Sequence, residues 1–265
     1  MLGFLKDRRR RRTMDAPFPP EWLAIVGKNV PLYGRLDEDD REALLDHVQV
    51  FLAEKRFEGA GGLEMTDEIR VTIAAQACIP ILRLDDADYY GRLRSIVVYP
   101  STYVVPQETR HGGVVHEDES VRLGESWHHG AVVLAWDSAR TGAANPADGR
   151  NVVLHEFAHQ LDQEDGGADG TPVLPLGGYV PWARVLGEHY LELRDDREDG
   201  RKTLLDGYGA TNEAEFFAVA TETFFEKPAQ LERRHPELYA ELARYFRQDP
   251  AAELRARAAA EEEAR

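Results

Sequence analysis

Cysteine is almost absent from this sequence of 265 residues, in which Cys78 is the single example. No disulfide can form within the chain, and a metal site built from several thiolates is excluded. Cys78 lies in the apolar run Ile73–Ile79, as expected for a small buried hydrophobic residue. The chain has nine histidines, so any metal site must use imidazole nitrogens and carboxylate oxygens.

Positive charge is also scarce, because 32 lysines and arginines stand against 48 acidic residues and give a net charge of -16. Such a surface repels phosphate, and we expect no nucleic-acid partner. Long hydrophobic runs are missing, so no membrane span is predicted. The apolar segment Met1–Leu5 precedes the basic run Lys6–Arg12, which reverses the order found in a secretion signal. The expected location is therefore cytoplasmic.

Internal repeats and glycine-rich phosphate-binding loops are absent too. The hydrophobic content of 43% is enough for a sizeable core, which we expect in a single domain over residues 15–250, with two closely packed lobes as an alternative. The run Arg8–Arg12 repels itself, so residues 1–14 are predicted to form a mobile basic tail. Residues 251–265 are predicted to form a polar C-terminal tail that is helix-prone but has nothing apolar to pack.

The spacing of apolar residues predicts several helices and two short strands. Ile96–Tyr99 and Ala131–Trp136 are rich in β-branched residues and predict strands, with a loop and an edge strand between them. Together these elements predict an α+β fold that is mainly helical and has a small mixed sheet. The helices are expected near residues 38–51, 69–84 with a break or end near Pro80, 152–161, 182–193, 213–226 and 237–246.

The segment His155–His159 has the pattern H-E-x-x-H. On a helix, residues four apart share a face, so both imidazoles can bind one ion while Glu156 reaches water on that ion. Asn151 is a suitable cap for such a helix. Zinc bound in this way keeps one position open and lowers the pKa of its water to about 7. The motif therefore predicts one hydrolytic zinc ion per chain, although five matching residues can also arise by chance.

A hydrolytic zinc site needs a third protein ligand, and a later predicted helix offers three glutamates. Glu215 and Glu222 are seven residues apart and share a face of that helix. Both lie among phenylalanines, where an unpaired carboxylate is costly, and a bound cation would account for at least one of them. Spacing alone does not choose between Glu213, Glu215 and Glu222.

These motifs resemble the Mlc titration factor A family of bacterial zinc peptidases. The resemblance implies a zincin-type metallopeptidase fold whose active-site helix carries the H-E-x-x-H motif. It also implies aminopeptidase-like activity on short peptides. It rests on residues 155–162 (HEFAHQLD), 124–127 (GESW), 215–219 (EFFAV), 73–78 (IAAQAC) and 98–100 (VYP), and covers roughly residues 18–250.

Residues 208–218 are also similar to the catalytic domain of anthrax lethal factor, in which the second glutamate of the matching stretch binds zinc and the tyrosine lies beside the metal. The similarity implies that Glu215 is the third ligand and that Tyr208 stabilises the oxyanion. In thermolysin-like enzymes an acid four positions after the ligand glutamate orients a zinc histidine, but this sequence has Val219 there. Asp162 is a candidate for that role, and a structural role in the turn after the helix fits it equally well.

The predicted reaction is hydrolysis of a peptide substrate, in which zinc polarises the carbonyl and Glu156 moves the protons. In peptidases of this class the substrate lies along an edge strand beside the zinc helix. Ala131–Trp136 is our candidate for that strand, although it also fits an ordinary buried strand. Trp127, His128 and His129 are candidates for lining the cleft, and the two histidines are left out of the metal site.

Two other functions are compatible with these residues. The family that the chain resembles sequesters a transcriptional repressor of sugar uptake, so a regulatory protein that binds such a repressor is the main alternative. Zinc-dependent hydrolysis of a non-peptide amide is another. The presence of Glu156 favours catalysis, because a purely structural zinc would need a fourth ligand and no general base.

Overall fold

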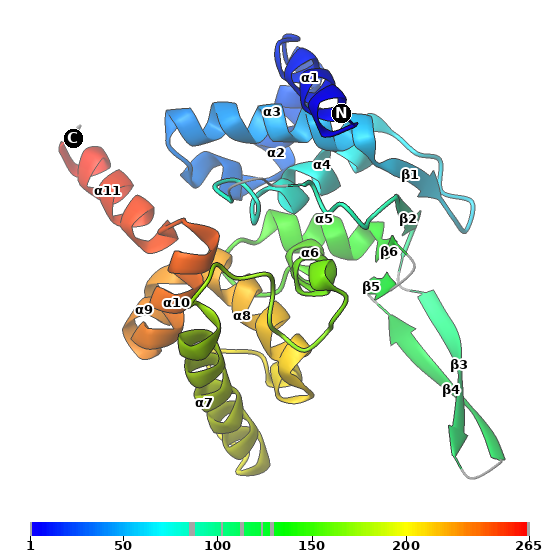
Figure 1. Ribbon diagram of the computed structural model, residues 1–265, viewed down its shortest axis with the longest axis vertical. Helices are drawn as coiled ribbons and strands as arrows, with labels where there is room; N and C mark the ends of the chain where they lie inside the picture. The colour runs from blue at the N-terminus through cyan, green and yellow to red at the C-terminus, as the bar shows by residue number, and fades with distance from the viewer. Residues whose placement is uncertain are drawn as a thin grey trace.

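The computed structural model of the protein describes residues 2–84, 88–101, 103–111, 114–122, 124–127 and 130–263. Helices dominate these residues, and a small sheet lies to one side of them (Figure 1). The predicted α+β class with mainly helical content is confirmed.

Eleven α-helices and three short 3-10 turns lie within the described ranges. In chain order they are α1 (Leu2–Met14), α2 (Pro20–Asn29), η1 (Pro31–Arg35), α3 (Glu38–Glu54), α4 (Asp67–Cys78), α5 (Trp136–Ala144), α6 (Val152–Asp162), η2 (Gln163–Asp165), α7 (Tyr179–Glu198), η3 (Gly207–Ala210), α8 (Glu213–Glu226), α9 (Pro228–Arg234), α10 (Pro236–Phe246) and α11 (Pro250–Glu263). The helices predicted near residues 152–161, 182–193, 213–226 and 237–246 are confirmed as α6, α7, α8 and α10.

A four-stranded sheet has the order β1-β2-β6-β5. Strands β1 (Arg56–Gly59), β2 (Ser95–Tyr99) and β6 (Ala131–Ala135) are parallel, and β5 (Gly124–Trp127) is antiparallel to β6, so the predicted mixed sheet is confirmed. Strands β3 (Tyr103–His111) and β4 (Val114–Arg122) form a separate hairpin that projects away from the helices (Figure 1).

The proposal of Ala131–Trp136 as an edge strand is wrong. Strand β6 pairs with β2 on one side and with β5 on the other, so its backbone is not available to a peptide. Residue Trp136 begins α5 instead of ending the strand. The edge strands of this sheet are β1 and β5, and β5 lies against α6. The apolar run of β6 fits this central position, because a strand covered on both faces is apolar without alternation.

Local hydrogen bonds explain where the central helices begin. The Asn151 side chain accepts from the backbone N–H groups of Val153 and Leu154, each at 3.1 Å, and so caps α6. Asn212 caps α8 in the same way by accepting from Glu215 N at 2.9 Å. These caps satisfy N–H groups that have no partner within a helix. They fix the starting points of the two helices that carry the predicted site.

Helix α6 lies at the centre of the described core. Its Phe157 is fully buried, with ring centroids 5.7 Å from Phe51 of α3 and 4.8 Å from Tyr90. Cys78, at the end of α4, is also fully buried, and burial raises the pKa of its thiol, as expected for an inert packing residue. The helix that carries the H-E-x-x-H motif is therefore held on its inner face by aromatic packing.

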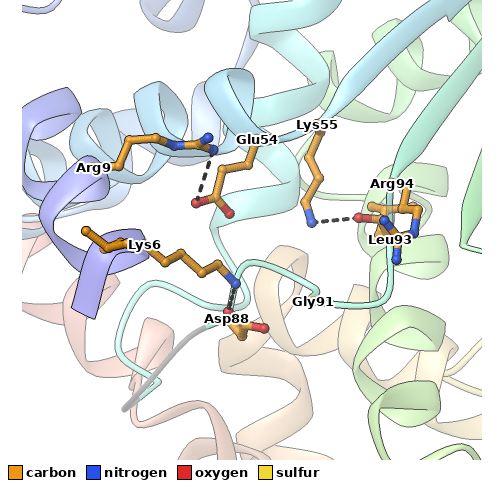
Figure 2. Close-up of a pocket in the computed structure, with 9 residues that line it drawn as sticks. Lys6, Arg9, Glu54, Lys55, Asp88, Gly91, Leu93 and Arg94 are labelled. Carbon is orange, nitrogen blue, oxygen red and sulfur yellow. Dashed lines mark hydrogen bonds and ion pairs between the residues drawn. The ribbon is translucent and has the colours of Figure 1, made fainter. Parts of the chain in front are cut away.

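The arginine run lies in helix α1, which differs from the tail expected for residues 1–14. Arg10 donates from Nε to Glu54 Oε1 of α3 at 2.8 Å, and Lys6 forms an ion pair with Asp88. Figure 2 shows Lys6 and Arg9 extending from α1 toward Asp88 and Glu54. These acids offset the repulsion between neighbouring arginines, which would otherwise oppose the helix.

The polar C-terminal segment is also helical, as its composition suggested, but it packs at its first turn. Ala251 of α11 is fully buried, and its N–H donates to the hydroxyl of Tyr239 at 3.0 Å. Among the described residues, no helix has both the length and the apolar character needed to cross a bilayer.

Candidate metal centre

Helix α6 directs two imidazoles toward one point. His155 and His159 are one helical turn apart, and their Nε2 atoms are 3.2 Å apart. Two unprotonated ring nitrogens repel each other at this distance, so a proton or a cation between them is needed to hold the pair together. The helix therefore presents a bidentate nitrogen site.

Helix α8 supplies a carboxylate at the same point. Oε2 of Glu215 lies 3.0 Å from Nε2 of His155 and 3.3 Å from Nε2 of His159. Glu215 is the third residue of α8, where the Asn212 cap fixes the backbone. Three ligand-type atoms from two helices thus converge, whereas Glu213 is exposed at the start of α8 and lies outside this group.

The spacing of these three atoms fits a tetrahedral metal ion. With zinc bonds of about 2.0–2.1 Å and tetrahedral angles, neighbouring ligand atoms lie about 3.3 Å apart. The three separations in the protein are 3.0, 3.2 and 3.3 Å. Two histidines and one glutamate are also the donor set of hydrolytic zinc sites that leave the fourth position for water. The residues present therefore suit a zinc ion.

Glu222 has a role that the sequence did not reveal. Its Oε1 lies 2.8 Å from Nδ1 of His155, and its Oε2 accepts the N–H of Asn151, the residue that caps α6. A carboxylate on Nδ1 keeps the proton on that nitrogen and leaves the Nε2 lone pair free for a metal. The available signal was the seven-residue interval from Glu215, because two helical turns place both acids along one face of α8.

The electrostatics of the cluster favour a positive charge at its centre. Burial acts to lower the pKa of His155, but hydrogen bonds to Glu215 and Glu222 outweigh it and raise that pKa well above its ordinary value. Burial likewise acts to raise the pKa of Glu215, yet His155 and His159 hold it well below its usual range. Both shifts describe the protein without a metal ion, and both reflect the carboxylates of Glu215 and Glu222 on the two sides of the His155 ring, which favour a positive charge there.

A further acid supports the start of α6. Burial raises the pKa of Glu226 to about 8, so this carboxyl is mainly neutral at pH 7. It accepts from the backbone N–H of Arg150 at 2.9 Å and from the side chain of Asn151 at 3.2 Å. Glu222 and Glu226, one turn apart on α8, therefore hold the cap of α6 in place.

Of the two residues predicted to act on the substrate, Glu156 is next to the ligand residue His155 in the chain, and Tyr208 contacts the ligand residue Glu215. Glu156 follows His155 on α6 and is 5% exposed. Tyr208 is 50% exposed on η3, and its hydroxyl donates to Oε1 of Glu215 at 3.3 Å. The neighbouring Gly209 allows this approach, because a Cβ there would lie 3.2 Å from Val219 of α8. The structure thus brings His155, His159, Glu215 and Tyr208 together, with Glu156 adjacent.

Asp162 takes the structural alternative. Its Oδ2 accepts the N–H of Gly170 at 3.0 Å, so it ties the end of α6 to the following loop. Gly170 has a φ of +78°, and a Cβ there would meet the carbonyl oxygen of Glu213 at 2.4 Å. Asp162 therefore has a structural role, because its hydrogen bond holds the loop at Gly170 close to α8. The orienting acid for His155 is Glu222 instead.

The residues proposed to line the cleft are only partly covered by the structure. Trp127 is the last residue of β5, and its backbone pairs with Ala131 of β6. His128 and His129 lie outside the described residues. The backbone of β5 is thus placed beside α6, and the cleft-lining role of these three side chains stays a prediction.

Comparison with known proteins finds relatives that match most of the chain. An uncharacterised protein of Synechocystis is 42% identical over 247 residues, which cover 92% of this chain and 90% of that protein. Proteins named Mlc titration factor A from Yersinia pestis and Yersinia pseudotuberculosis are 32% identical over 231 residues, covering 86% of this chain and 84% of theirs. The resemblance inferred from the motifs is therefore confirmed. The family described as glucose-regulated metallo-peptidase M90 matches residues 4–247, and a chain that matches over this length and carries such a histidine and glutamate cluster belongs to that family.

Proposed function

We propose that this protein is a zinc-dependent peptidase of zincin type, in which His155, His159 and Glu215 hold one zinc ion. The observation that carries the proposal is the convergence of their three ligand atoms, at 3.0 to 3.3 Å from one another, in a member of a metallo-peptidase family. Imidazole and carboxylate suit zinc better than the hard cations calcium and magnesium, which prefer oxygen ligands alone.

The residues around the metal position have separate roles in the proposed reaction. When bound, zinc supplies Lewis-acid chemistry: it polarises the scissile carbonyl and acidifies water at its open position. Glu156 accepts the proton of the attacking water and passes it to the leaving amine. The hydroxyl of Tyr208 donates to the oxygen on which negative charge develops. Glu222 keeps the His155 ring in one orientation and tautomer throughout.

We assign the substrate-binding edge to β5. A peptide could pair antiparallel with β5, because β6 is the only described strand that pairs with it and α6 lies next to it. Ladder hydrogen bonds of this kind position a backbone without reading side chains. Aminopeptidase-like cleavage of short peptides is the specificity that the family resemblance supports.

The test of catalysis is the substitution Glu156→Gln. It preserves the size of the side chain and removes the proton acceptor, so we expect hydrolysis of a peptide library to fall by about a hundredfold or more. Zinc content, measured by elemental analysis, should stay close to wild type. Glu213→Gln, an exposed acid on α8, is the matched control and should retain full activity. A Glu156→Gln protein that cleaves as fast as wild type would refute the water-activation role.

The second candidate is a regulatory protein that binds a transcriptional repressor. The name Mlc titration factor A, carried by relatives at 32% identity, favours this candidate. Binding of a repressor needs a surface and does not need a general base, so Glu156→Gln should leave it unchanged. If wild type cleaves nothing in a broad library while both proteins bind the repressor of the same organism, the regulatory function becomes the better description.

A further inference from the structure

A second group of metal-ligating side chains lies on α7 and at the junction of α9 and α10. His189 and Glu192 are three residues apart on α7, and His235 is the residue between the two shorter helices. Figure 1 shows these three helices packed together on the side of the molecule away from the sheet. We propose that His189, Glu192 and His235 form a second binding site for a zinc-class divalent cation, separate from the proposed catalytic centre.

The geometry brings one carboxylate oxygen between two imidazoles. Oε2 of Glu192 lies 3.1 Å from Nδ1 of His189 and 4.0 Å from Nδ1 of His235. The two rings meet edge to face, with centroids 5.1 Å apart and an interplanar angle of 85°. One ligand atom from each residue lies within 4.8 Å of the others. The 4.0 Å between Glu192 and His235 exceeds the spacing of about 3.3 Å expected around tetrahedral zinc, so we expect weaker binding than at the first centre.

The backbones of His189 and His235 are held in place, and the side chain of Glu192 can move. The backbone N–H of His235 donates to the carbonyl of Leu231, and its carbonyl accepts from Tyr239, so the residue is fixed between α9 and α10. His189 lies in the interior of the 20-residue helix α7. The carboxylate of Glu192 is more than half exposed and can swing inward to close around an ion.

The surroundings of the three side chains leave room for a cation. A cavity of about 100 Å³ adjoins the cluster, which gives room for an ion and its water. Asp196 adds negative charge to the cavity wall, whereas Lys202 and Arg234 reduce the attraction. This balance also indicates moderate affinity.

A bound ion would brace the segment that leads to Tyr208. The same cavity is bounded by Lys202, Thr203, Leu204 and Leu205, and the chain continues from there into η3. Linking α7 to the α9–α10 junction across this cavity would limit movement of that wall. The second ion is therefore expected to stabilise the fold, without contact to the reacting atoms.

The experiment uses the full chain, stripped of metal by a chelator and dialysed against Zn²⁺ with excess Mg²⁺ to mask the acidic surface. Wild type should take up two equivalents of zinc. Glu215→Gln should take up one, and the added combination His189→Gln with His235→Gln should remove that one. Zinc should raise the melting temperature of Glu215→Gln, but not that of the triple variant. These readouts do not depend on peptidase activity or on whether the first site is catalytic.

Single substitutions on α7 provide the sharpest comparison. In the Glu215→Gln background, Glu192→Gln should weaken zinc binding at least tenfold, whereas Glu188→Gln should leave it unchanged. Both glutamates are exposed on α7, and neither substitution should impair folding. The proposal is overturned if Glu215→Gln retains no zinc, if the two glutamine variants bind equally, or if the histidine substitutions leave uptake unaltered.

Discussion

At the scale of single residues, His155 contacts more of the site than any other ligand residue described above. Its Nε2 faces His159 and Glu215, and its Nδ1 faces Glu222. Because Glu222 also accepts the N–H of Asn151, the orientation of the ring is tied to the first residue of its own helix. A rotation of His155 would break both contacts. The ring is therefore oriented with Nε2 toward the metal position before any ion binds.

The roles of Glu215 and Glu222 can be separated by matched substitutions to glutamine. Glu215→Gln should lose the zinc bound between His155 and His159, because it removes a ligand charge from that metal position. Glu222→Gln should keep the metal but with an affinity lowered by about 10- to 100-fold, the range measured when a partner of a ligand histidine is removed. Competition with a chelator of known affinity measures both effects, with Glu213→Gln as the control.

The opposite pattern would contradict the assignment. An empty Glu222→Gln site beside a fully loaded Glu215→Gln site would mean that Glu222 is the ligand and that the two acids exchange roles when metal binds.

The residues of the site differ in how far sequence could predict them. His155, Glu156 and His159 follow from one helical motif, so their relative placement depends only on local geometry. Glu215 and Glu222 lie on a different helix, and which acid reaches Nε2 and which reaches Nδ1 depends on how α8 crosses α6. That crossing is a property of packing and has no local signature. The resemblance to known peptidases pointed to Glu215, and the hydrogen bonds of Glu222 became visible only in the fold.

At the scale of elements, caps and apolar spacing predicted helices better than they predicted the sheet. Asn151 marks a helix start that the structure confirms, because its capping hydrogen bonds are made within three residues. Strand order depends on contacts between distant segments, and the edge position of β5 could not be derived from the apolar run of β6. Helix α1 shows the same limit, since the acids that stabilise it, Glu54 and Asp88, are distant in sequence.

Deletion of residues 1–14 tests whether the metal site depends on α1. Helix α1 packs on α3, and its ionic partners are Glu54 and Asp88. We expect zinc content and peptidase activity to be retained. The loss of the partly buried pair between Arg10 and Glu54 should cost about 1 kcal/mol, which lowers the melting temperature by about 2–4 °C in a chain of this size. Arg10→Ala should reproduce most of this shift, whereas the exposed Arg8→Ala should not.

The carboxyl group of Glu253 on α11 predicts how the stability of the protein depends on pH. Burial raises the pKa of Glu253 to about 7, with Arg83 acting against this and Asp40 adding to it. The unfolded chain releases this proton near its ordinary pKa of 4.5, so between pH 4.5 and 7 the folded protein binds more protons than the unfolded one. Stability therefore falls as pH rises through this window, and the full penalty is present above pH 7.

Glu253→Gln removes that penalty. At pH 8 the variant should be more stable than wild type by about 1 kcal/mol, and the difference should shrink or vanish at pH 4.5. Thermal unfolding across this pH range measures the effect. Glu263→Gln, near the exposed end of the same helix, makes the same change in net charge and is expected to show no such dependence. Equal pH profiles for the two variants would show that burial of Glu253 carries no penalty.

At the scale of the whole molecule, the candidate metal centre lies where two buried helices meet. Residues Phe157 of α6 and Phe217 of α8 are both fully buried, and the ligand residues are on the same two helices. A metal ion would therefore link two elements that apolar packing already holds together. This differs from small zinc domains, in which the metal replaces a core. The fold should not require the ion, although the ion should stabilise it.

Removal of the metal tests this relation between site and fold. The stripped protein should keep its helical circular dichroism, because the core is large and the hydrogen bonds between His155, Glu215 and Glu222 hold the site together at neutral pH. Adding zinc at a free concentration of about 100 times its Kd should stabilise the native state by about 2.7 kcal/mol, since only the folded chain brings the three ligands together. In a chain of this size that corresponds to a rise in melting temperature of roughly 5–10 °C. Glu215→Gln should lose most of the rise, and His235→Gln should keep most of it. A stripped protein that unfolds completely would instead mean that zinc, rather than packing between α6 and α8, determines the fold.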